Sequence, residues 1–97
     1  MPKFNTRVEL HKLGESQHRE TYAELHAAME RAGFRRTISS SDGDVYHLPH
    51  AEYKKETGET LEQVQSQAKN AANSVHTPNG VITWEYTGSR WEGLIRV

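Results

Sequence analysis

Histidine is the residue of this sequence best suited to acid–base chemistry, and the 97-residue chain contains six of them. The imidazole group titrates near neutral pH, so it can give or take a proton in metal-independent RNA cleavage. His47 and His50 flank a Leu-Pro pair, and His11 follows the first alternating segment. If these segments form neighbouring strands, the three side chains can approach one another. We predict His11 and His47 as candidate catalytic residues, against the plain alternative that each lies at the surface or at the edge of the core.

Histidines also bind transition metals, but their spacing here matches no established metal motif. The chain has no cysteine, and neither an HExxH motif nor a paired-carboxylate signature accompanies the histidines. The sequence also lacks P-loop, nucleophile-elbow, dinucleotide-binding and calcium-loop patterns. We therefore expect no metal and no cofactor, and retain a histidine-based metal binder as a minor alternative.

A second group of side chains could contact phosphate through positive charge. The candidate nucleic-acid-binding residues are Arg7, Arg35, Arg36, Lys54 and Lys55. Such contacts position a nucleic-acid strand without reading its sequence. The net charge of −1 argues against a protein that binds mainly by charge, because such domains are usually strongly basic. A local basic patch is still compatible with this charge, and the alternative is a solvated surface on which charges pair across strands.

Aromatic residues gather toward the C-terminus, where Trp84, Tyr86 and Trp91 follow one another closely. Aromatic side chains on an exposed sheet can stack on the bases of single-stranded RNA. The sequence lacks the Lys/Arg-Gly-Phe type of motif that marks RNA-recognition domains, however. In a chain this short, we expect the tryptophans mainly in the core or in a dimer interface.

The elements that must position these residues begin with a strand over residues 3–10. Apolar or small side chains alternate there with polar ones, which is typical of a half-buried strand. A helix is predicted from an N-cap at Ser16 to about Ala32. Gly33 provides the left-handed residue that ends this helix, and a second strand follows over residues 36–38.

A hairpin is predicted next, because Asp42 and Gly43 form a strong turn signal. The returning strand covers residues 45–48, and Pro49 ends it. Residues 50–59 are rich in charge, and we expect them to be irregular.

The second half of the chain repeats the alternation of helix and strand. A capping box at residues 60–63 begins a second helix, a strand over residues 81–86 follows it, and residues 91–97 could add one more. This order predicts a single α+β domain over residues 1–97. The expected fold is a ferredoxin-like β-α-β-β-α-β sandwich, with two helices on one face of an antiparallel sheet. Any chemistry then belongs on the open face, at the strand ends or in the loop over residues 47–55.

The composition also bears on the compartment and the assembly. Without cysteine the chain can form no disulfide, and a small fold without such cross-links is often cytosolic and stabilised by dimerisation. The first residues lack the apolar stretch of a signal peptide, and no segment has the apolar length of a membrane span. We therefore expect a cytoplasmic homodimer without membrane association.

Three segments carry a resemblance to a known family: residues 3–11, 22–34 and 46–53. They resemble small bacterial proteins of unknown function that begin with an Arg-Val-Glu-Leu-His strand and continue into a helix ending in Gly-Phe. That family is similar to the GhoS-type antitoxins, which are ferredoxin-like endoribonucleases. The likeness covers roughly the first two thirds of the chain.

The resemblance implies a dimer that binds or cleaves single-stranded RNA as a component of a toxin–antitoxin pair. CRISPR-associated nucleases of related shape carry an aspartate at the end of the first strand, where this chain has Glu9, Leu10 and His11. An endoribonuclease activity would therefore be metal-independent. The alternative is a non-catalytic, dimeric protein-interaction module of phage or plasmid origin, which the near-neutral charge and the lack of a catalytic motif favour.

Overall fold

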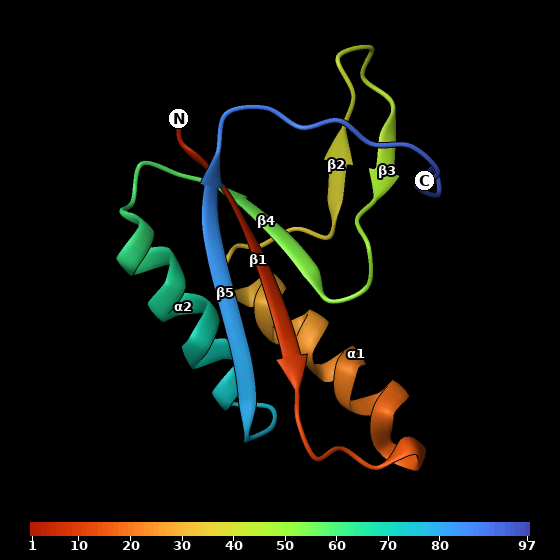
Figure 1. Ribbon diagram of the computed structural model, residues 1–97, viewed down its shortest axis with the longest axis vertical. Helices are drawn as coiled ribbons and strands as arrows, with labels where there is room; N and C mark the ends of the chain where they lie inside the picture. The colour runs from red at the N-terminus through yellow and green to blue at the C-terminus, as the bar shows by residue number, and fades with distance from the viewer.

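A computed structural model describes all 97 residues of the chain (Figure 1). The strands are β1 (Lys3–Leu10), β2 (Thr37–Ser39), β3 (Val45–His47), β4 (Glu52–Glu56) and β5 (Asn79–Tyr86), and the helices are α1 (Glu15–Arg31) and α2 (Leu61–Asn73). Strands β4, β1 and β5 form an antiparallel sheet in that order, and β2 pairs with β3 in a second sheet. The prediction of a small α+β protein with an antiparallel sheet is confirmed.

The alternation of β1 divides the core from the open face, as predicted. Its even-numbered residues, from Phe4 to Leu10, are all buried. Phe4, Val8 and Leu10 belong to one core cluster with residues of α1 and α2, and both helices lie on the same side of the three-stranded sheet (Figure 1). Burying a side chain such as Leu25 stabilises the fold by about 1.5–3 kcal/mol. The face that remains open carries the odd-numbered residues of β1.

The helix ends follow the signals in the sequence, with one shift. The N-cap of α1 is Gly14 and not Ser16, and it makes no side-chain cap. Gly33 has a φ of 93° and ends the helix as predicted. In α2, Thr60 and Gln63 form the predicted capping box through hydrogen bonds of 2.8 and 3.1 Å. Neither helix has the length and apolar composition that crossing a bilayer requires.

The neighbour of β1 is the main departure from the predicted order of elements. Residues 50–59 are not irregular, because β4 forms within them and pairs with β1. Tyr53 is the only residue of β4 that is buried, and four charged residues surround it, so the sequence shows no alternation there. The strand β3 ends at His47 and pairs with β2 and not with β1. Two backbone hydrogen bonds of 2.8 Å between Arg35 and Lys54 join the start of this hairpin to the outer edge of β4.

The segment after β5 does not form the additional strand considered for residues 91–97. It crosses to the β2–β3 hairpin (Figure 1), where it makes an isolated bridge with β3. The amide of His47 donates to the carbonyl of Ile95 at 2.8 Å, and that of Val97 donates to Val45 at 2.9 Å. This C-terminal segment therefore passes over one end of the open face.

Candidate functional site

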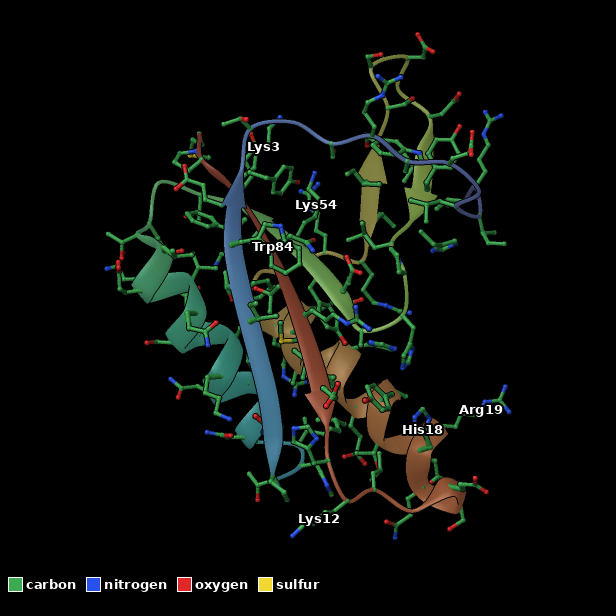
Figure 2. The ribbon with its side chains drawn as sticks, viewed as in Figure 1. Lys3, Lys12, His18, Arg19, Lys54 and Trp84 are labelled. Carbon is green, nitrogen blue, oxygen red and sulfur yellow. The ribbon has the colours of Figure 1, made fainter.

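The face of the main sheet opposite the helices carries cations and aromatic rings in neighbouring positions. In the strand register, Asn5 lies between Lys54 of β4 and Trp84 of β5, and Lys3 lies opposite Tyr86. Figure 2 shows Lys3, Lys54 and Trp84 near one another at this end of the sheet. Alternate residues of a strand point to the same face, so these side chains share one surface.

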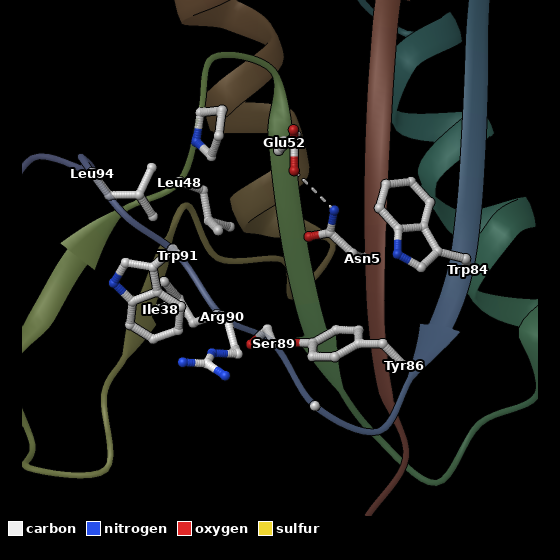
Figure 3. A pocket seen from close by; sticks show the side chains of 12 residues that line it. Asn5, Ile38, Leu48, Glu52, Trp84, Tyr86, Ser89, Arg90, Trp91 and Leu94 are labelled. Atoms are coloured by element: carbon white, nitrogen blue, oxygen red, sulfur yellow. Dashed lines mark hydrogen bonds between the residues drawn. The ribbon is translucent and has the colours of Figure 1, made fainter.

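An apolar cleft of about 260 Å³ lies over this surface. The sheet forms its floor, and the C-terminal segment and the β3–β4 connection form its walls (Figure 3). The side chains that line it are Asn5, Ile38, Leu48, Pro49, Glu52, Trp84, Tyr86, Ser89, Arg90, Trp91 and Leu94. On the floor, Nδ2 of Asn5 donates to Oε1 of Glu52 at 3.0 Å. This bond fixes the Asn5 amide and leaves its oxygen as an acceptor for a ligand. Neither tryptophan belongs to the buried core.

A wider, polar hollow adjoins the cleft, and Ser89, Arg90 and Trp91 line both. The other residues around the hollow are Lys3, Ser39, Ser40, Ser41 and Tyr46. The hydroxyl of Ser40 is buried without a hydrogen-bond partner. Hydroxyl groups and cations are the donors that bind oxyanions. The hollow therefore offers an oxyanion site beside an aromatic cleft.

Several cations of this face are free of carboxylate partners. The ion pairs of the structure are His11–Glu9, Lys55–Glu59 and Arg96–Asp44. Lys3, Lys54 and Arg90 take part in none of them, so their charge is available to an external anion. Glu52 and Glu56 of β4 lower the net charge of the face. Attraction for an anion is therefore concentrated in the hollow, where Lys3 and Arg90 have no carboxylate among the lining residues.

The predicted phosphate-binding residues do not form one site. Arg35 and Lys54 lie together at the outer edge of β4 and, with Lys55, line a small hollow. Arg7 is exposed farther along β1, opposite Ile82. Arg36 lies elsewhere, beside a group of histidines, and Lys55 is not on the open face.

Lys55 belongs to the helix-covered side of the sheet. Its ammonium group donates to the carbonyl of Ala32 at 3.0 Å and to Oε1 of Gln67 at 2.6 Å. It also lies 3.2 Å from Oε1 of Glu59 and 5.3 Å from the centre of the Phe34 ring. Hydrogen bonds from Gln67 and Lys55 hold the pKa of Glu59 below its usual value. These contacts tie the end of α1 to α2, so Lys55 stabilises the fold and is not free for a ligand.

The candidate catalytic residues His11 and His47 are not brought together. That prediction depended on pairing between β1 and a strand over residues 45–48, and the pairing is wrong because β4 occupies that place. His11 lies after β1, where its Nδ1 is 3.2 Å from Oε1 of Glu9 and its carbonyl accepts from Nε2 of His76 at 2.7 Å. His47 is exposed on the separate hairpin. The structure therefore places the two residues at different sheets and does not pair them.

A different cluster, formed by His18 and His26 of α1 and by His50, is present instead. The ring centres of His18 and His50 are 5.9 Å apart, and those of His26 and His50 are 6.0 Å apart. Tyr22 packs 4.6 Å from His18 and 4.5 Å from His50. Nδ1 of His26 forms a hydrogen bond of 2.7 Å with the hydroxyl of Tyr53. His18, Tyr22 and His26 follow one another at intervals of four residues, which places them on one face of α1 and is a sequence signal for this cluster. The placement of His50 depends on β4.

Burial and neighbouring positive charge favour the uncharged forms of His26 and His50. Burial, Arg36 and His50 lower the pKa of His26 from 6.5 to about 4. Burial, His18 and Arg36 likewise lower the pKa of His50. Burial raises the pKa of Tyr53, although Arg36 opposes this effect. No group of three or more His, Cys, Asp or Glu side chains is placed to hold a metal ion.

No protein-family model, curated protein or solved structure matches this chain. The structure itself therefore supplies the evidence for function, in two places. The cleft and the hollow can hold a flat ring beside an oxyanion. The histidine cluster beside Arg36 concentrates groups that become cationic on protonation.

Proposed function

We propose that the open face binds single-stranded RNA, with bases in the aromatic cleft and phosphates along the polar hollow. The observation that carries the proposal is the shared wall of these two spaces, formed by Ser89, Arg90 and Trp91. Each nucleotide of a nucleic-acid strand carries one flat base and one phosphate. A surface with both chemistries side by side is therefore complementary to a nucleotide.

Trp84, Tyr86 and Trp91 provide the surfaces on which bases would stack. Trp84 is 39% exposed on the floor of the cleft, and the other two rings are half-buried around it. Stacking on an aromatic side chain contributes about 1–3 kcal/mol per base. Bases can be stacked in this way only when they are unpaired, so the site favours a single strand over a duplex.

Phosphate contacts would come from Lys3 and Arg90, with the hydroxyls of Ser39 and Ser41 as further donors. Lys54 flanks the floor of the cleft, next to Asn5 in the register. Two or three cations are few for a nucleic-acid-binding protein, and the net charge is only −1. We therefore infer that stacking supplies most of the affinity and that charge positions the strand.

The resemblance to GhoS-type antitoxins supports the same proposal. We infer a ferredoxin-like arrangement, in which the chain that starts at Arg35 would be the outer neighbour of β4. A place in a toxin–antitoxin pair and cleavage of the bound strand are further expectations from that resemblance. Cleavage is tested by measuring the length of the RNA after incubation with the protein.

The deciding experiment measures binding of a fluorescently labelled, single-stranded RNA by anisotropy. Replacing Trp84 with alanine is expected to weaken binding roughly tenfold, because one stacking surface is lost. Leu61→Ala is the matched control, because Leu61 is also 39% exposed but lies on α2. Equal affinities for the Trp84→Ala variant and the unmodified protein would contradict the proposal.

A second candidate function is that of a dimeric protein-interaction module, and the free edge of β5 favours it. The amide of Val8 donates to Ala51, so even-numbered residues of β1 bond toward the β4 side and odd-numbered ones toward β5. The backbone groups of Thr83 and Glu85 on β5 then point outward. Side chains of α2 cover only the carbonyls of Asn79 and Val81. A second copy could pair with the uncovered part, which light scattering would show as a dimer.

A further inference from the structure

We propose that Arg36, His18 and His50 form a binding site for a phosphate group, at the side of the molecule where the β3–β4 connection meets α1. The two imidazole rings lie 5.9 Å apart and are close to parallel, with an angle of 23° between them. Arg36 is exposed and forms no ion pair. This site is separate from the aromatic cleft. The inference deepens the proposed function, because the choice of an RNA phosphate as the ligand rests on that function.

The charge around the cluster is what indicates an anion. The groups that face it are His18, Tyr22 and His26 from α1, His50 from the β3–β4 connection, Tyr53 from β4 and Arg36 from the α1–β2 connection. None of them is a carboxylate. Three imidazoles and one guanidinium are therefore neighbours, and the charge of Arg36 disfavours a proton on His26 or His50. A phosphate would supply the missing negative charge.

The donors of the site suit a phosphate in number and direction. The guanidinium of Arg36 can give two parallel hydrogen bonds to two oxygens of one phosphate. A neutral imidazole still carries one N–H donor, so His18 and His50 can each add one bond without first being protonated. His26 is less available, because its Nδ1 is already bonded to the hydroxyl of Tyr53. His26 and Tyr53 therefore support the site from below and do not belong to its binding surface.

The site borders the cleft through two short connections. The carbonyl of Arg36 accepts the amide hydrogen of Leu48 at 2.8 Å, and Leu48 lines the cleft. Pro49 lines the cleft as well, and the next residue is His50. An RNA strand that leaves the cleft over Pro49 would therefore next meet His50, which follows Pro49 in the sequence, and Arg36, which is bonded to Leu48. The site then fixes the direction in which the strand leaves.

The test follows the ring protons of the histidines by NMR, in inorganic phosphate and in chloride at equal ionic strength. Phosphate is expected to move the resonances of His18 and His50 and to raise the titration midpoint of His50 by about half a pH unit. His47 is the internal control, because it is exposed on β3 and away from the cluster. A phosphate effect on His50 no larger than that on His47 would overturn the inference.

Two substitutions separate binding from a general effect of salt. Arg36→Gln should abolish the response of His50 to phosphate, whereas Arg31→Gln, an exposed arginine in the last turn of α1, should leave it intact. Arg36 is also exposed, so its variant should unfold at the same urea concentration as the unmodified protein. An undiminished response in Arg36→Gln would show that the site does not bind phosphate as inferred.

Single-stranded RNA then distinguishes this inference from the proposed function. Oligonucleotides with a 5′-phosphate and with a 5′-hydroxyl should both move His50 if the site binds the backbone, and only the first should do so if it binds a terminal phosphate. Either result supports the site. Binding of RNA that depends on Trp84 but leaves His50 unmoved would refute the site alone. A response to inorganic phosphate without any RNA binding would refute the proposed function and leave the site standing.

Discussion

His26 of α1 and Tyr53 of β4 share a hydrogen bond of 2.7 Å between Nδ1 and the phenol oxygen. Burial raises the pKa of Tyr53, so the phenol keeps its proton. The phenol is the stronger donor, and Nδ1 of a neutral imidazole therefore accepts. This places the ring proton of His26 on Nε2. In this arrangement the Tyr53 hydroxyl donates to the neutral His26 ring, and the bond joins the first helix to the central sheet.

Acid is therefore expected to destabilise the protein through His26. Its pKa is about 4 in the folded state, against an ordinary value of 6.5, so the unfolded chain binds the proton more readily. The stability contributed by the neutral ring is complete above pH 6.5 and is lost as the pH falls toward 4. We expect a loss of about 1–2 kcal/mol between pH 7 and pH 4.5, discounted for the solvent that reaches the ring. Urea unfolding at the two pH values measures it.

The control for the acid effect is a comparison of two histidines. His26→Gln should remove most of this pH dependence, and His47→Gln should retain it, because His47 is exposed on β3. If both variants lose stability in acid as the unmodified protein does, other groups are responsible.

Two adjacent lysines are predicted to have opposite roles. Lys55→Met should lower the free energy of unfolding by about 1–2 kcal/mol, because two hydrogen bonds and the contact with Glu59 are lost. It should leave RNA affinity unchanged. Lys54→Met should do the reverse, weakening RNA binding severalfold with little effect on stability, because Lys54 makes no side-chain bond and flanks the cleft. Urea unfolding and anisotropy on both variants check the crossover.

RNA binding is expected to depend only weakly on salt. Each phosphate contact with a single strand contributes a slope of about −0.7 to the log–log dependence of affinity on salt, so three contacts predict a slope of about −2. Anisotropy titrations at several salt concentrations measure it. A slope several times steeper would mean that charge, and not the aromatic cleft, dominates binding.

A proline at the outward-facing position of β5 tests the dimer. Glu85→Pro removes an amide that points away from β1, so the monomer should tolerate it, whereas pairing with a second copy should not. Light scattering at micromolar concentration is expected to show a dimer for the unmodified protein and a monomer for the variant. Trp84→Pro is the contrasting change. Trp84 pairs with Asn5 of β1, so removing the Trp84 amide hydrogen should destabilise the sheet itself. Equal masses for Glu85→Pro and the unmodified protein would exclude β5 as the interface.

The sequence predicted those parts of the fold that depend on local signals. The burial of alternate residues in β1, the left-handed Gly33 and the capping box at Thr60 are all present. It did not predict β4, because a strand with one buried tyrosine among four charged residues has no periodic pattern. Pairing with β1 stabilises β4, and pairing is a long-range property.

The candidate site was predicted only in part for the same reason. Trp84 and Trp91 stood out as aromatic residues, but only the path of the C-terminal segment places them around one cleft. Lys3 and Arg90 lie far apart in the sequence and meet at the hollow. The expected contact between His11 and His47 required a strand pairing that β4 replaces, and the cluster around His50 appears only once β4 is in place.

The C-terminal segment makes one wall of the cleft without contributing a residue to the core cluster. It is attached to the hairpin by the hydrogen bonds at Ile95 and Val97 and by the exposed pair of Arg96 and Asp44. This wall of the cleft and the core are thus formed by different stretches of the chain. Residues 87–97 can therefore vary in sequence without disturbing the core. Such variation would change the ligand preference of the cleft. Among relatives of this protein, that segment is where divergence in specificity should accumulate.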